Sequence, residues 1–231
     1  MAIRLPIHSA TRELVLVNQI WPWLTLMLLG AYHGLSPGMG WLFAVALGLQ
    51  EKSGKAVVRA LFPIAIGHAV SVGLAVALLA AGKASIPQNI LPWITAGLLV
   101  GFGIFKLVRP RHPKWVGMQV NAKDLVLWSF LMATAHGAGL MLLPVFVMGE
   151  NSAELCHGEG CHNAAGLSLS SPAGYIAAIS LHTLAMLTVA AIVALVVYYK
   201  VGLAILRRAW FDLDRVWAGA LILAGVMGLL L

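Results

Sequence analysis

Charged residues are scarce in this chain: they make up 10% of its 231 residues, whereas a typical soluble domain contains about a quarter. Cysteine is scarcer still, with two residues, so no framework of disulfides holds the fold together. Hydrophobic residues account for 61% of the chain, and its mean hydropathy is +0.91. These proportions exclude a water-soluble globule and a disordered chain. They also exclude a nucleic-acid-binding domain, although the net charge is +7.

Long apolar runs fill most of the sequence. They cover residues 14–49, 56–81, 90–107, 125–148, 175–199 and 216–231. A membrane-spanning helix needs about 20 apolar residues, so the sequence predicts an all-α polytopic integral membrane protein with six spans. Seven spans result if the first run is a hairpin. No length remains for a soluble catalytic domain, and we therefore expect a protein that is not an enzyme.

Positive charge gathers in alternate connections between these runs. Five Lys or Arg residues lie in residues 106–123, four in 200–215 and three in 50–59, but one in 82–89 and none in 149–171. Because Lys and Arg mark cytoplasmic loops, the three basic connections (50–59, 106–123 and 200–215) are predicted to be cytoplasmic. We expect a bacterial inner (plasma) membrane protein whose C-terminus and 149–172 loop are extracytoplasmic.

Two stretches of the chain resemble each other. Residues 31–39 read AYHGLSPGM and residues 134–141 read TAHGAGLM, so each has His-Gly followed by Gly and Met. The next apolar run in each half holds one further histidine, and the third holds none. Two units of three spans point in opposite directions through a bilayer, which predicts an inverted repeat with broken first helices and a site at the midplane.

This repeat favours one discontinuous first span, interrupted near Pro37 and Gly38, over a hairpin. The expected organisation is an interfacial N-terminal segment (1–20), a first three-helix repeat (21–110), a basic cytoplasmic linker (111–123) and a second three-helix repeat (124–231) that contains the extracytoplasmic loop 149–172.

Four histidines lie deep in the apolar runs: His33, His68, His136 and His182. Ionisable side chains at that depth are costly and mark ion pathways or cofactor sites. Neutral imidazole binds first-row transition metals, so we expect an ion of nickel, cobalt, copper or zinc as substrate or bound ion. No acidic residue lies inside the runs, which favours weak, transient occupancy. The same histidines could instead carry protons.

Four methionines in the apolar runs could add thioether ligands: Met39, Met132, Met141 and Met186. Met39 and Met141, which lie in the repeated motif, are the further candidate metal ligands. Their thioethers would favour monovalent copper. Methionines in apolar helices more often serve as packing, and this alternative stays open.

The extracytoplasmic loop contains the sequence CHGEGCH, which supplies the candidate ligands Cys156, His157, Cys161 and His162. A metal-capturing or metal-releasing element is one interpretation. A disulfide between the two cysteines on an oxidising face is the second. Covalent haem attachment is the third, although the loop is too short to enclose a haem.

Residues 30–40 (GAYHGLSPGMG), followed by residues 67–72 (GHAVSV), resemble motifs of the nickel/cobalt efflux family and of urease-accessory-type membrane transporters in the lysine-exporter superfamily. There the first motif reads roughly His-x-x-x-Pro-Gly-His-Gly-Lys, and a His and Ser pair follows one span later. The resemblance implies a six-span inner-membrane transporter. Its matched positions are His33, Pro37, Gly38 and His68, whereas Met39 replaces the family's second His and Trp41 its Lys.

The Ser36-Pro37-Gly38 sequence also resembles the Ser-Pro-Cys break of the thiol transporters of cytochrome c biogenesis, which are distant relatives of that superfamily. Those proteins relay electrons through a cysteine in each half. Neither cysteine of this chain lies in an apolar run, so a thiol relay is excluded.

The sequence therefore predicts transport of a transition-metal cation by alternating access between two inverted halves. A haem-binding membrane redox protein and a transporter of a small organic or sulfur anion are the alternatives. The expected partners are the lipid bilayer and the metal ion, with no nucleic acid. A homo-oligomer or a periplasmic metal-carrying partner is compatible with this interpretation.

Overall fold

The computed structural model describes residues 7–87, 89–108, 121–154, 171–201 and 213–230, and every regular element within these ranges is helical. In chain order the elements are α1 (Ile7–Leu35), the 3-10 turn η1 (Pro37–Met39), α2 (Trp41–Gln50), α3 (Gly54–Ser85), α4 (Leu91–Val108), α5 (Ala122–Ala135), α6 (Ala138–Glu154), α7 (Pro172–Val196), the π-helical turn η2 (Val197–Val201) and α8 (Leu213–Leu230). The all-α prediction is confirmed for the described residues.

Three helical segments are long and apolar enough to cross a membrane: Gly54–Gly82, Leu91–Val108 and Pro172–Lys200. The bent pair Ala122–Ala135 and Ala138–Phe146 makes a fourth if it counts as one span. Only 39%, 28% and 28% of the three apolar windows is buried inside the molecule, so most of their apolar surface faces outward. This pattern is compatible with a membrane protein, and the six spans stay a prediction.

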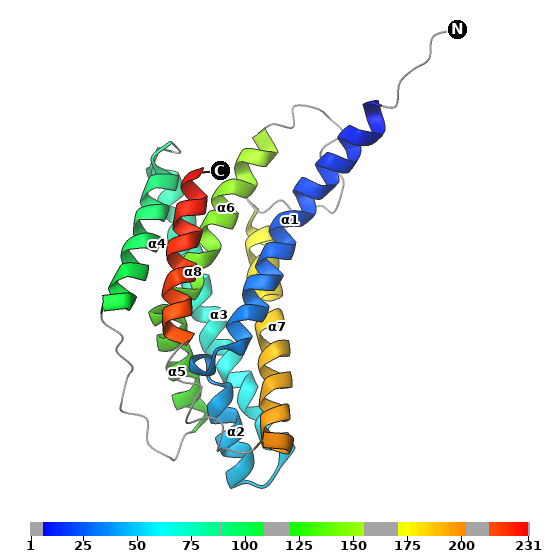
Figure 1. Ribbon diagram of the computed structural model, residues 1–231, viewed down its shortest axis with the longest axis vertical. Helices are drawn as coiled ribbons and strands as arrows, with labels where there is room; N and C mark the ends of the chain where they lie inside the picture. The colour runs from blue at the N-terminus through cyan, green and yellow to red at the C-terminus, as the bar shows by residue number, and fades with distance from the viewer. Residues whose placement is uncertain (1–6, 88, 109–120, 155–170, 202–212, 231) are drawn as a thin grey trace.

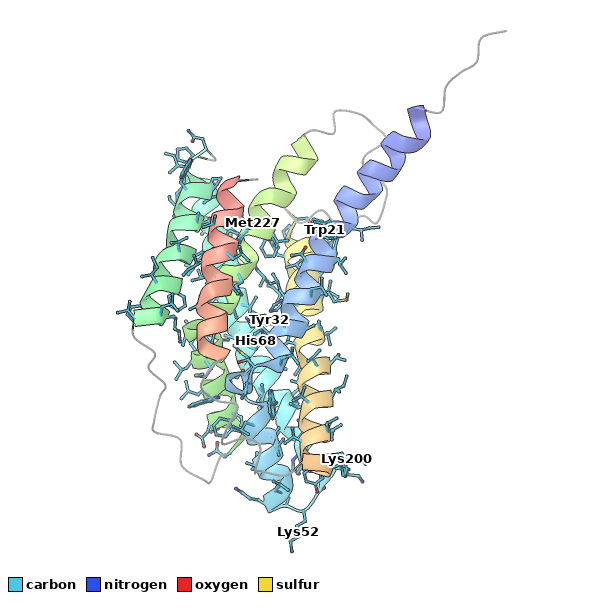
Figure 2. The ribbon with its side chains drawn as sticks, in the orientation of Figure 1. Trp21, Tyr32, Lys52, His68, Lys200 and Met227 are labelled. Atoms are coloured by element: carbon cyan, nitrogen blue, oxygen red, sulfur yellow. The ribbon has the colours of Figure 1, made fainter. Side chains whose placement is uncertain are left out.

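The helices lie roughly along one common direction (Figure 1). From the N-terminus, α1 and α2 descend in this view, α3 ascends and α4 descends, whereas α5 and α6 ascend, α7 descends and α8 ascends. Figure 2 places Lys52 and Lys200 at one end of the bundle, Trp21 and Met227 toward the other, and His68 between them. Lys52 and Lys200 thus lie at a different height along the bundle axis from His68.

Backbone chemistry explains the first break, which we define as residues 36–40. Pro37 has no N–H to continue the helical ladder, and Ser36 before it is extended, so α1 ends at Leu35. Gly40 has φ 108°, a left-handed value that suits glycine, and α2 begins at the next residue. The indole N–H of Trp41 donates to the Leu35 carbonyl over 3.3 Å. Figure 1 shows α2 continuing in the direction of α1, so the first apolar run is a discontinuous helix and not a hairpin.

Helix α1 runs without a break from Ile7 through residue 20, although it contains Pro22. This one helix thus includes part of the expected N-terminal segment and the start of the expected first repeat. Residues 109–120 of the basic linker and 155–170 of the long loop lie outside the described residues, while α6 reaches Glu154 and so enters the segment expected to be loop.

The second break consists of His136 and Gly137. His136 caps α5 with its backbone N–H donating to the Met132 carbonyl over 2.8 Å, and Gly137 has φ 68°. Helix α6 starts at Ala138, bent by 54° relative to α5. A left-handed residue at this point is easiest for glycine, which explains why the sequence ends one helix and starts another here.

Glycines set the closest helix contacts. Gly30 and Gly34 of α1 face α7, where an added Cβ would overlap the carbonyl oxygens of His182 and Met186 respectively. Gly67 of α3 faces α5 in the same way, against the Val126 carbonyl. Small residues spaced four apart permit such backbone approach between apolar helices. The pairs α1–α7 and α3–α5 are therefore packed with little space for larger side chains.

Candidate functional site

Three imidazoles, each from a different helix, meet in the interior; we name His33, His68 and His182 the histidine trio. Their ring centroids are 5.7 Å apart for His33–His68, 5.1 Å for His33–His182 and 5.5 Å for His68–His182. All three side chains are 0% exposed. The trio joins α1 and α3, from the first part of the sequence, to α7, from its later part.

Carbonyl groups orient two of these rings. His33 Nδ1 lies 2.9 Å from the Leu29 carbonyl oxygen, and His182 Nδ1 lies 3.1 Å from the Leu26 carbonyl oxygen. A carbonyl oxygen only accepts, so Nδ1 carries the proton and donates in each case. In the neutral ring, Nε2 then carries the lone pair. Metal-binding histidines are commonly held in this way, with the other ring N–H on a carbonyl.

His68 has a different environment from the other two. Both of its ring nitrogens are buried without a hydrogen-bond partner among the described residues, as is Nε2 of His182. A buried polar atom that forms no hydrogen bond is costly, by about 1–3 kcal/mol. Such atoms in native proteins call for a functional explanation, of which an absent ligand is one.

The ring separations fit a shared metal ion, but the ring orientations do not yet converge on one. Three imidazoles bound at about 2.0–2.1 Å to a single ion would have centroids about 5.2–5.5 Å apart. The observed 5.1–5.7 Å brackets that range. However, His68 and His182 are stacked at an interplanar angle of 13°, and the described residues contain no group of three His, Cys, Asp or Glu side chains placed to hold an ion.

Turning one ring would resolve this mismatch. His68 loses no hydrogen bond to described residues when its side chain rotates, because neither of its nitrogens forms one there. The rings of His33 and His182 are fixed by their carbonyls. His68 is therefore the member of the trio whose reorientation costs least.

The fourth histidine, His136, lies at the second break, at the C-terminal end of α5. Its Nδ1 donates to the Met132 carbonyl over 2.8 Å, the same local bond as in His33. A Cβ on Gly38 would lie 3.2 Å from His136 Cε1 and 3.0 Å from Met132 Cε, so the two breaks touch each other. His136 also interacts electrostatically with His33. The ring contacts given above thus join three of the four expected imidazoles, and His136 lies at the second break.

The two candidate methionines occupy separate positions. Met39 is 1% exposed in η1 and belongs to the first break. Met141 is 3% exposed and packs with Leu99 and Leu221, between α4, α6 and α8. This apolar cluster gives Met141 a packing role. The remaining candidates, Cys156, His157, Cys161 and His162, lie outside the described residues.

Three features of the site escaped the sequence interpretation. Gly30, which permits the approach of α7, was not singled out, although its spacing from Gly34 is a recognisable signal. A hydroxyl pair, Ser71 and Thr134, joins α3 to α5 at 2.8 Å, and Ser129 Oγ donates to the Ile64 carbonyl over 2.7 Å. Such pairs between distant residues have no periodic signature in a single sequence.

Comparisons with known proteins give no relative for this chain: no protein-family model, no curated protein and no solved structure matches it.

Proposed function

We propose that this chain is a membrane transporter of a transition-metal cation and that the histidine trio is its central site. The observation that carries the proposal is the mutual ring distance of 5.1–5.7 Å among three fully buried imidazoles from α1, α3 and α7. A pathway site must bind strongly enough for the ion to enter and weakly enough for it to leave. A trio that needs one ring to turn before it closes on an ion suits transient occupancy.

We further propose that α1–α4 and α5–α8 form two inverted halves of three spans each. In support, each half starts with a broken helix, and the corresponding helices run in opposite directions in Figure 1. Exchanging the halves also exchanges the packing pairs: α1 packs on α7, and its counterpart α5 packs on α3. The proposed halves thus share an interface at the trio, as alternating access requires.

The orientation in the inner membrane is part of the same proposal. Lys52 and Lys200 lie at one end of the bundle (Figure 2), and each belongs to a connection that is rich in Lys and Arg. The positive-inside rule then assigns this end to the cytoplasm and the 149–172 loop to the opposite face.

The trio favours a metal ion over haem. A haem with two axial histidines needs the plane between their rings for the porphyrin. At the trio the third imidazole occupies that space for every pair of rings. An anion substrate would need positive charge, and the described lysine and arginine side chains lie at helix ends.

The test is metal uptake by proteoliposomes that contain the purified protein, with nickel, cobalt, zinc and reduced copper offered separately. His68→Leu replaces the unpartnered imidazole with a side chain that suits the interior, so folding is expected to persist. Uptake of the transported metal should fall at least about tenfold, which corresponds to about 1.4 kcal/mol. Thr95→Val is the matched control, because Thr95 is buried in α4 and its hydroxyl bonds the Leu91 carbonyl of its own helix.

Two results would overturn the proposal. One is the absence of uptake above that of protein-free liposomes for all four metals. The other is equal uptake by wild-type protein and His68→Leu, with both variants eluting as folded protein in detergent.

A further inference from the structure

The charge of the groups around the trio distinguishes one class of metal ion from another. No Asp or Glu occurs in residues 14–50, 52–123, 125–149 or 160–211, the stretches that hold the four membrane histidines. Of the acidic residues that bound these stretches, Glu51 and Asp124 have described side chains, and both have partners at helix ends. Glu51 pairs with Arg59 at 2.7 Å, and Asp124 completes the capping box of Asn121.

An ion at the trio would therefore be surrounded by neutral donors only. The cost of moving an ion from water into a low-dielectric interior grows with the square of its charge, so a divalent ion costs about four times as much as a monovalent ion of similar size. Many divalent sites offset this cost with carboxylates or thiolates. The described surroundings of the trio provide neither, which favours a single positive charge.

Two of the histidines have a buried methionine one helical turn away in the sequence. Met186 is one helical turn after His182 on α7, and both side chains are 0% exposed, so they share the buried face of that helix. Met132 lies on α5 one helical turn before His136, and its Cε approaches Gly38. Thioether and imidazole together select monovalent copper among biological metals.

Coordination number points the same way. The trio supplies three imidazoles, one ligand fewer than a tetrahedral divalent ion needs. A monovalent copper ion accepts two or three ligands. His33 and His182 present oriented rings, and Met186 adds a sulfur on the same helix face as His182.

We infer that the ion handled by the histidine trio is monovalent copper, bound by neutral imidazole and thioether donors; this inference rests on the proposed function. Silver(I) has the same charge and the same preference for soft ligands, and it serves as the redox-stable probe.

The experiment is equilibrium binding of silver(I), of copper(I) under a reductant without oxygen, and of nickel(II), cobalt(II) and zinc(II), to the purified full-length protein. Silver(I) and copper(I) should bind at least about 100-fold more tightly than any of the divalent ions. Met186→Leu keeps an apolar side chain of similar size and removes the sulfur, so silver(I) affinity should fall at least about tenfold.

His68→Met sharpens the assignment. It replaces an imidazole with a thioether, so silver(I) binding should persist within about tenfold, whereas His68→Leu should lose it. Met227→Leu is the control for methionine removal, because Met227 is exposed on α8 and lies away from the trio (Figure 2).

The outcomes separate the two proposals. If a divalent ion binds as tightly as silver(I) and His68→Leu abolishes that binding, the monovalent assignment fails and the metal-transport proposal stands. If no ion binds in a manner that depends on His68 or His182, both fail.

Discussion

At the first break, residues 36–40 separate α1 from α2, whereas at the second break His136 and Gly137 alone separate α5 from α6. A histidine at or near each break makes the same local hydrogen bond. His33 Nδ1 donates to the Leu29 carbonyl and His136 Nδ1 to the Met132 carbonyl, in each case four residues earlier. Next to the first break, His33 lies in ring contact with His68 and His182, whereas at the second break His136 lies against Gly38 of the first break.

The packing around each break explains this difference. Close to His33, Gly30 and Gly34 bring α1 against the backbone of α7, and His182 Nδ1 then reaches the Leu26 carbonyl of α1. His136 instead faces Gly38 of the opposite break. His33 and His136 therefore have the same local bond but different neighbours, because different helices pack against them. The following predictions probe that inequality.

The largest effect is expected from removing the histidine at each break. His33→Ala should weaken binding of the transported metal by at least about 100-fold, or about 2.7 kcal/mol, because it removes a member of the trio. His136→Ala removes a neighbour only and should weaken binding by less than about tenfold. Equilibrium metal binding by the two purified variants measures the ratio. Equal losses would contradict the unequal roles of the two breaks.

The second-largest effect is expected from disturbing the close contact between α1 and α7. Gly34→Ala places a methyl group against the Met186 carbonyl, so the helices must separate, at a cost of about 1–3 kcal/mol. Thermal unfolding in detergent should shift to lower temperature, and metal affinity should fall with it. Gly73→Ala is the matched control, since nothing lies within 4 Å of its added Cβ. A destabilisation as large for Gly73→Ala would show that helix glycines matter here for reasons other than this contact.

Backbone conformation distinguishes the breaks more finely. Gly40 has φ 108° and Gly137 has φ 68°. The latter lies close to the left-handed helical region that other residues occasionally adopt, at a cost of about 1–2 kcal/mol. Gly40→Ala should be the more destabilising of the two, by about 1 kcal/mol in chemical unfolding. Gly137→Asn should recover part of the loss caused by Gly137→Ala, because asparagine tolerates this conformation; no recovery would count against a left-handed residue at 137.

The smallest effect concerns the hydroxyl bonds that join α3 to α5. Ser129→Ala removes the 2.7 Å bond to the Ile64 carbonyl, and interhelical bonds of this kind contribute about 0.6 kcal/mol. The loss should be visible in unfolding and should leave metal affinity within about twofold, because the hydroxyl of Ser129 bonds a backbone carbonyl of α3 and holds none of the ring nitrogens. A large loss of affinity would extend the site toward α5.

The sequence predicted which residues belong to the site and where helices break better than it predicted how these residues are arranged in space. Pro37 and the His-Gly pairs predicted both breaks, because proline and left-handed glycine interrupt helices by local chemistry. Helix α1, by contrast, continues past residue 20, since a proline inside an apolar helix removes one hydrogen bond without ending it.

Which histidines meet could not be predicted from depth alone. All four lie within apolar runs, and His136 differs from His33 only through tertiary packing. The ring positions depend on where Gly30 and Gly34 allow α7 to approach, a contact across about 150 residues of chain.

Metal-edge X-ray absorption of the loaded protein tests the central claim most directly, with the ion that binds most tightly as absorber. Wild-type protein should show scattering from imidazole rings, weaker in His182→Leu and unchanged in His136→Ala. Absence of imidazole scattering, or an identical spectrum for His182→Leu, would show that the three buried rings do not hold the ion.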